Sequence, residues 1–202
     1  MTIRKLAAAT VAAALSLGVA TQASAQAAAP AAVTQGPPIA GVCILSVEGA
    51  IGSSTVGKYV QTRLQQIATQ VQAELKADET SINNEAKALD AAKASLDQAT
   101  LEKRANDLQT KANTYQRKGQ QRQREMQATQ EKALGRIGQE MDPLIRQAYQ
   151  QKQCSVLLQR EALVIANPAM DLTPQVVTAL NAKITQFAFD RERLDQTAPA
   201  GN

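Results

Sequence analysis

The stretch "YVQTRLQQIATQVQAEL", Tyr59 to Leu75, decides the fold, because its large apolar residues recur at steps of three and four. The pattern continues, with steps of seven, through a chain that has no proline between Val56 and Tyr115. Such spacing is typical of a coiled-coil seam. The members of this first seam are Val60, Leu64, Ile67, Val71, Leu75, Ile82, Leu89 and Leu96.

A second seam follows at comparable spacing. Its members are Leu101, Ala105, Leu108, Ala112, Tyr115, Gly119, Met126, Ala133, Ile137, Met141, Leu144 and Ala148. A helix with one apolar stripe needs a partner that covers the stripe, and the nearest partner is the other helix folded back on it. Capping residues such as Ser95, Asp97 and Thr100 place the turn near 94–100. We therefore predict a coiled-coil hairpin over residues 53–152; the alternative is one uninterrupted rod.

The distribution of charge favours the hairpin. Residues 74–102 hold seven acids and three bases, and residues 111–124 hold five bases and no acid. Folding back near residue 98 brings these blocks together, where each exposed pair contributes roughly a few tenths of a kcal/mol. The predicted pairs are Lys111 with Glu85, Arg117 and Lys118 with Glu79, and Arg122 with Glu74.

The basic block has a second interpretation. Its side chains could contact an acidic client chain or anionic lipid instead of the acidic arm of the hairpin. The residues concerned are Lys111, Arg117, Lys118, Arg122 and Arg124.

Two short segments rich in Val, Ile and Leu flank the hairpin, Gly41–Ile51 and Cys154–Ala166. Turn-forming residues bound both of them, as expected for strands. The second segment divides into two strands, Ser155–Leu158 and Ala162–Ala166. Because the hairpin returns the chain to its starting point, we expect a small antiparallel sheet of three strands.

A further helix should pack on this sheet, with Thr173 as its cap and Pro174 in its first turn. Val177, Leu180, Ile184 and Phe187 are expected on its apolar face. In the return helix, Pro143 either kinks the helix or restarts it.

The predicted fold class is α+β, mostly α: a long antiparallel coiled-coil hairpin that projects from a small antiparallel β-sheet body with a C-terminal helix. We expect one domain over residues 39–188, in which 39–52 and 153–188 form the body. Residues 189–202 are expected to be a frayed tail.

The N-terminus has the pattern of an export signal. Arg4 and Lys5 precede the apolar run Leu6–Ala20, and the small residues Ala23-Ser24-Ala25 predict cleavage after about Ala25. Removal of residues 1–25 leaves 20 Lys and Arg against 18 Asp and Glu, a net charge of +2. Residues 26–38 hold too few large apolar side chains to order themselves and are expected to be a disordered leader.

Cys43 and Cys154 stand at the starts of two predicted strands. In an exported protein such a pair could form a disulfide. The alternative is that both are small apolar residues buried in the sheet.

Motifs for catalysis are missing from the sequence. There is no histidine, glycine-rich phosphate loop, nucleophile elbow or CxxC pair. We therefore expect no enzyme, no cofactor and no metal. A nucleic-acid partner is also not expected, because Tyr115 is the one aromatic residue near the basic block and export removes the partner.

The order of these features resembles the Skp (OmpH-like) family of periplasmic chaperones over roughly residues 40–188. The resemblance rests on the strand "GVCILSV", the long hairpin, "MDPLIRQAY" at 141–149 and above all "NPAMDLTPQVVTALN" at 167–181. It implies a periplasmic homotrimer with a β-structured body and three helical tentacles. The cavity between the tentacles would receive unfolded outer-membrane proteins, and such a holdase needs no ATP.

The alternative function is a structural coiled-coil spacer or adaptor that links components of the cell envelope. Contact with an anionic membrane surface is expected to be weak. The predicted tip, residues 93–104, holds Lys93, Lys103 and Arg104 against Asp97 and Glu102.

Overall fold

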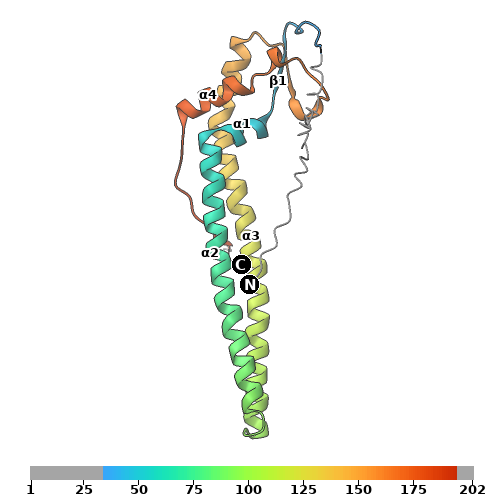
Figure 1. Ribbon diagram of the computed structural model, residues 1–202. Helices are drawn as coiled ribbons and strands as arrows, with labels where there is room; N and C mark the ends of the chain where they lie inside the picture. The colour runs from blue at the N-terminus through green and yellow to red at the C-terminus, as the bar shows by residue number, and fades with distance from the viewer. Residues whose placement is uncertain (1–33, 195–202) are drawn as a thin grey trace, which may run out of the picture. The chain divides into compact units, whose positions relative to one another are not determined.

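The computed structural model describes residues 34–194, and those from Gln35 onward belong to one compact unit. Its elements are β1 (Val42–Leu45), α1 (Val47–Ser53), α2 (Thr55–Ala92), α3 (Gln98–Gln151), β2 (Val156–Gln159) and α4 (Thr173–Lys183), with short 3-10 helices η1 (Arg160–Ala162) and η2 (Pro168–Met170) (Figure 1). The predicted signal peptide and residues 26–33 of the predicted leader lie outside the described residues.

The α+β, mostly α fold class is confirmed, because α2 and α3 pack along each other as an antiparallel hairpin (Figure 1). Residues 93–97 join the two helices. Asp97 caps α3 by accepting a hydrogen bond from the Thr100 amide at 2.9 Å. Pro143 lies inside α3, so the return helix does not restart there.

The apolar core lies where the sheet, α1 and α4 pack against the base of the hairpin. Val176 and Leu180 are fully buried on α4, and Ile137 on α3 is buried beside them in the same cluster. The predicted apolar face of α4 is wrong at its end, because the helix stops at Lys183 and leaves Ile184 and Phe187 outside it.

The predicted antiparallel sheet of three strands is wrong. β1 pairs with β2 in parallel, with Val42 opposite Val156 and Leu45 opposite Gln159. No strand forms over residues 162–166, where Val164 is 98% exposed and Ile165 is 64% exposed.

The cause of the parallel pairing lies before the hairpin. The apolar run that begins at Gly41 is a strand only as far as Leu45, and Ser46 then caps α1 by accepting from the Gly49 amide at 3.0 Å. Helix α1 lies crosswise at the end of α2 (Figure 1). Because α1 lies between β1 and the hairpin, β1 and β2 need not run antiparallel although α2 and α3 do.

The parallel pairing also brings the two cysteines together. In an antiparallel pair, Cys154 would face the end of β1, whereas in the observed register it lies beside the beginning of β1. Cys43 and Cys154 form a disulfide with a Cα–Cα distance of 5.8 Å, which joins the segments that precede and follow the hairpin.

Gly57 allows α1 and α2 to meet at a sharp corner. A Cβ atom added at this position would lie 1.8 Å from the Ile51 carbonyl oxygen. Ser54 completes the corner, because its hydroxyl donates to that oxygen at 2.7 Å and accepts from the Gly57 amide at 3.0 Å.

The chain after α4 does not fray at residue 189. Residues 184–194, named the strap below, run back along the hairpin toward its tip (Figure 1). The prediction of a frayed tail is wrong for residues 190–192, whose side chains form ion pairs with α2 and α3. Residues 195–202 lie outside the described residues.

The part of the predicted leader that the structure describes is also tied down. The Asn167 side chain donates to the Gly36 carbonyl at 2.8 Å, and the Gln35 side chain donates to the Ala166 carbonyl at 3.4 Å. Residues 35 and 36 are thus hydrogen-bonded to the loop between β2 and α4.

Candidate functional site: the hairpin groove under the strap

The strap is an extended segment whose side chains alternate between two environments. Phe187, Phe189 and Arg191 are partly buried, whereas Gln186, Ala188 and Asp190 are exposed. This period of two is typical of extended chain. The two phenyl rings lie 5.4 Å apart between centroids and pack against the apolar core cluster.

Residues of both helices hold the strap in the groove between them. On α2, the Arg63 Nε donates to the Phe189 carbonyl at 3.3 Å, and its guanidinium forms an ion pair with Asp190. On α3, the Thr129 hydroxyl accepts from the Glu192 amide at 2.9 Å. These two hydrogen bonds tie the strap backbone to the hairpin.

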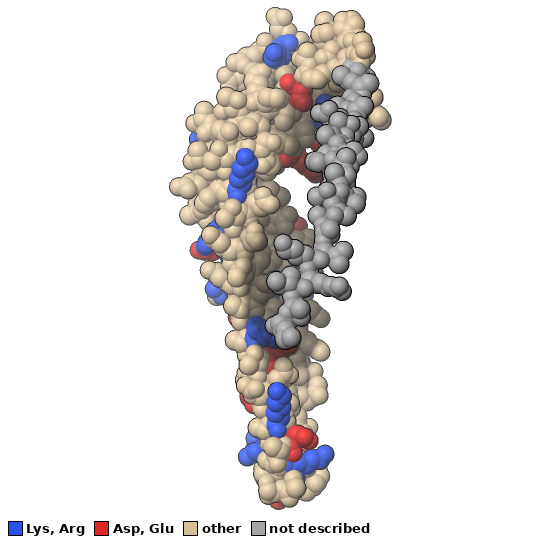
Figure 2. Space-filling view, in the orientation of Figure 1, with Lys and Arg blue, Asp and Glu red and all other residues tan. Residues whose placement is uncertain are grey.

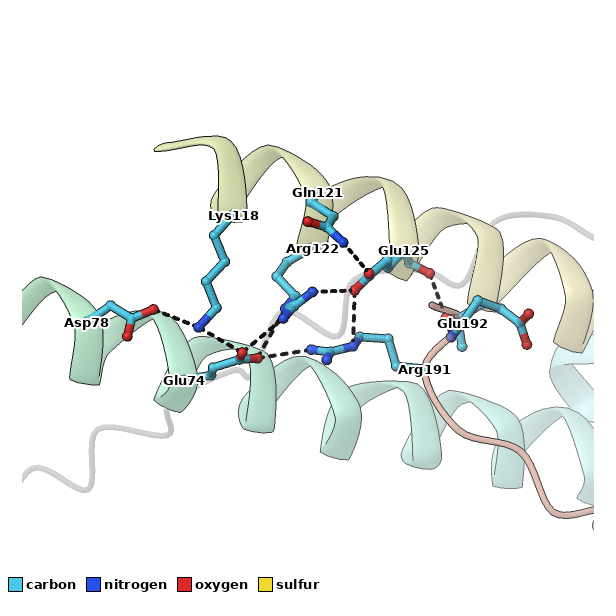
Figure 3. Close-up of polar contacts among 9 residues, drawn as sticks. Glu74, Asp78, Lys118, Gln121, Arg122, Glu125, Arg191 and Glu192 are labelled. Atoms are coloured by element: carbon cyan, nitrogen blue, oxygen red, sulfur yellow. Dashed lines mark hydrogen bonds and ion pairs between the residues drawn. The ribbon is translucent and has the colours of Figure 1, made fainter. Parts of the chain in front are cut away.

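Six charged residues from α2, α3 and the strap meet at the far end of this groove (Figure 3). This charged cluster consists of Glu74, Asp78, Lys118, Arg122, Glu125 and Arg191. With three acids and three bases, the cluster has no formal net charge.

Two arginines bridge two glutamates in the cluster. Arg122 donates to both carboxylate oxygens of Glu74 at 3.0 and 3.1 Å and to Glu125 at 2.9 Å. From the strap, Arg191 donates to Glu74 at 3.1 Å, and its Nε lies 3.2 Å from Glu125. The strap therefore supplies one of the two cations that contact both Glu74 of α2 and Glu125 of α3 (Figure 3).

Burial makes the pairing of Glu125 energetically important. Its side chain is 0% exposed, and a buried carboxylate is strongly destabilising unless cations and hydrogen bonds compensate it. Gln121 adds a hydrogen bond to the other carboxylate oxygen at 3.1 Å. If Arg191 left, Glu125 would keep Arg122 but lose its second cation.

The neighbouring charges also shift ionisation equilibria. Hydrogen bonds from Arg122 and then from Lys118 hold the pKa of Glu74 far below its ordinary value of 4.5, against the opposing effect of burial. In return, the pKa of Lys118 is raised, chiefly by its hydrogen bond to Asp78, and the pKa of Arg122 is raised by its hydrogen bond to Glu74.

The hairpin beyond the charged cluster is packed differently. No residue between Gln72 and Arg124 is buried, and the predicted seam residues there are at best half-buried. Pockets open along this part of the seam. One of about 510 Å³ is lined by Leu89 and Leu108, and another of about 410 Å³ by Ile82 and Tyr115.

Most of the predicted basic residues face the acidic arm. The pairs of Lys111 with Glu85, at 2.6 Å, and of Arg122 with Glu74 are confirmed. The pairing with Glu79 is wrong, because Lys118 contacts Glu74 and Asp78 instead.

The two remaining basic residues point to solvent. Arg117 and Arg124 are exposed, and Arg117 donates to the Thr114 hydroxyl at 3.0 Å. Figure 2 shows acidic and basic side chains intermixed around the tip of the hairpin.

Sequence reasoning missed Glu125, Thr129 and Arg191, and also Arg63. A signal for the first two exists: the second seam lacks a large apolar residue between Met126 and Ala133, and the position one turn before Met126 is Arg122. The signal for Arg191 is its spacing of two from Phe189 and of four from Phe187.

A second exposed feature lies on the body. Large apolar side chains are exposed on β2, in the loop that follows it and, at residue 39, shortly before β1. They are Ile39, Val156, Leu158, Val164 and Ile165.

Within residues 34–194, no group of three or more His, Cys, Asp or Glu side chains is placed to hold a metal ion. Within the same residues, every helix is too short or too polar to cross a membrane.

Comparisons with known proteins agree with each other. The family model described as "Outer membrane protein (OmpH-like)" matches residues 41–180. A crystal structure from Caulobacter crescentus, described as a candidate outer membrane chaperone (OmpH-like), is 55% identical in sequence. It superposes with a TM-score of 0.78 and covers 82% of this chain and 98% of its own. A comparison with curated proteins finds no match.

Proposed function

Because this chain belongs to the OmpH-like family of outer membrane proteins, we propose that it is a periplasmic holdase chaperone for unfolded outer-membrane proteins. One observation carries the proposal: within residues 34–194, the hairpin beyond the charged cluster has an apolar seam that no third element covers. A purely mechanical spacer would gain stability by burying that seam, whereas a chaperone needs it accessible.

The exposed seam suits weak and distributed binding. Its apolar side chains are half-buried and separated by charged and polar residues, so a bound chain would make many small contacts. Such a surface can hold many sequences without selecting one motif. Holding a chain in this way uses binding energy alone, so the proposed holdase requires no ATP.

The exposed apolar residues of the body support a trimer. A two-stranded sheet is marginally stable by itself, and the apolar surface around β2 invites another copy of the chain. In the proposed trimer these surfaces are buried against one another, and three hairpins enclose the client cavity.

The exposed basic residues supply the proposed polar contacts. Arg117 and Arg124 are available to an acidic client segment or to anionic lipid, whereas Lys111, Lys118 and Arg122 are engaged with the acidic arm. Membrane contact at the tip is proposed to be weak, because Lys103 there pairs with Asp107 at 2.9 Å.

The test is suppression of aggregation when a urea-denatured β-barrel protein is diluted into buffer with the mature protein at a stoichiometric ratio. We expect the protein to keep the client soluble and the double variant Leu89→Ser/Leu108→Ser to lose most of this effect. The matched control is Asn83→Ser/Gln109→Ser, at exposed polar positions of the same helices.

Two results would contradict the proposal. Client that aggregates as fast with the protein as without it would favour the spacer, and a monomer by light scattering would remove the trimer and its enclosed cavity. Circular dichroism of each variant checks that helical content is retained.

A further inference from the structure

We propose that the groove under the strap is a binding site for an extended apolar segment, and that the strap is its built-in, displaceable occupant. The competing partner is a segment of unfolded client chain with large apolar side chains at alternate positions. This identification of the partner rests on the proposed function; the groove itself is argued from the strap.

The contacts of the strap are those of a peptide in a groove. It has no regular secondary structure, and side chains of α2 and α3 supply most of its anchors. Its backbone accepts a hydrogen bond from Arg63 and donates one to Thr129, and a different sequence of the same extended form could make both.

The strap leaves space in the groove. On the α3 side, a pocket of about 750 Å³ lies between Phe187, Phe189 and Ala133. On the α2 side, a pocket of about 260 Å³ is lined by Tyr59 and the same Phe189. Side chains larger than those of the strap would therefore fit beside both helices.

The alternation of buried and exposed side chains along the strap indicates which kind of segment could replace it in the groove. Phe187 and Phe189 enter the groove at every second position, and Arg191 follows at the next position of the same face. Transmembrane β-strands carry apolar side chains at every second position, with aromatic residues near both ends of the strand. An unfolded strand of a β-barrel thus presents the pattern that the groove already holds.

The groove is continuous with the exposed seam of the proposed client surface. The strap reaches the charged cluster through Arg191, and open pockets begin at Asp78 and Lys118, which are members of that cluster. Displacement of the strap would extend the client-binding surface toward the body.

The experiment uses the full-length mature protein and a fluorescein-labelled synthetic peptide with the sequence of residues 184–194, ITQFAFDRERL. Binding is measured by fluorescence anisotropy. In the variant Phe187→Ser/Phe189→Ser the resident strap is weakened, and we expect the peptide to bind at least about tenfold more tightly than to the unmodified protein. Gln186→Ser/Ala188→Ser, at exposed positions of the strap, should bind the peptide no better than the unmodified protein.

A control peptide and a third variant test whether binding depends on the apolar pattern and on displacement of the strap. A peptide with both phenylalanines replaced by serine should not bind, which ties binding to the apolar pattern. Arg191→Gln removes one ionic anchor and should raise peptide affinity by a smaller factor than the double variant. Circular dichroism shows whether each variant keeps its helical content.

The outcomes separate the two proposals. Equal peptide affinity for the double variant and the unmodified protein overturns the inference, even if client aggregation is suppressed. Peptide binding that a urea-denatured β-barrel protein competes away supports it. Peptide binding without such competition overturns the client as partner. Failure of every form to suppress aggregation rejects the holdase, and the peptide measurement still decides whether the groove accepts an extended segment.

Discussion

The two halves of one hairpin differ in how their shared seam is packed. Toward the body, α2 and α3 bury Val60, Ile67, Ile137 and Met141, with α4, the strap and the disulfide nearby. Beyond the charged cluster, the same two helices bury no residue up to the turn. In this hairpin, the narrow apolar stripes of the two helices are fully buried only in the half where a third element packs on them.

The largest difference in the stability effect of a substitution is expected between two glycine positions, one in each half. Gly57→Ala should destabilise the protein by about 3 kcal/mol or more, because the new methyl group meets the Ile51 carbonyl and the corner must open. Gly119→Ala, in the far half where nothing lies within 4 Å of the added atom, should stabilise α3 by about 1 kcal/mol. Urea unfolding followed by circular dichroism measures both. Equal effects would contradict the difference in packing.

The next comparison removes one isoleucine from each half. Ile137→Ala should cost about 3 kcal/mol because the side chain is fully buried and leaves a cavity. Ile82→Ala should cost about 1 kcal/mol or less, since its side chain is only half-buried and a pocket is already present. The same urea titrations apply. A larger loss at residue 82 would mean that the far half holds the core.

The disulfide should stabilise the body half specifically. Replacing both Cys43 and Cys154 with serine should lower the free energy of unfolding by about 2–4 kcal/mol, because the bond closes a loop of 111 residues. Non-reducing mass spectrometry of the unmodified protein should show no free thiol. Two free thiols, or a variant of unchanged stability, would contradict this assignment.

A smaller effect is expected at the boundary between the halves. Arg191→Ala should cost about 1–3 kcal/mol, because buried Glu125 loses its second cation. The matched control Arg193→Ala, at an exposed position of the strap, should change stability by less than about 0.5 kcal/mol. Similar values for the two variants would show that the strap does not hold the cluster together.

The sequence predicted the hairpin because periodicity is a local signal that many residues repeat. It also predicted two ion pairs, Lys111 with Glu85 and Arg122 with Glu74, because an antiparallel fold fixes which residues lie opposite each other. Those predictions needed no knowledge of the body.

The direction of the sheet could not be predicted in the same way. The short apolar run from Gly41 to Ile51 is compatible with either strand or helix, and α1 within it decides whether β1 and β2 run parallel. The strap was missed for a related reason. Its partners Arg63 and Thr129 lie more than 60 residues away in the sequence, and charged residues near a terminus are usually solvated.

Amide hydrogen exchange of the free protein, resolved along α2 and α3 by mass spectrometry, tests the difference between the halves most directly. The body half should exchange only through global unfolding, because its seam is buried, while the far half should open locally and exchange much faster. We predict that the change in exchange rate falls near Glu74 on α2 and near Arg122 on α3, at the charged cluster. Equal protection along both helices, up to the turn, would contradict the account.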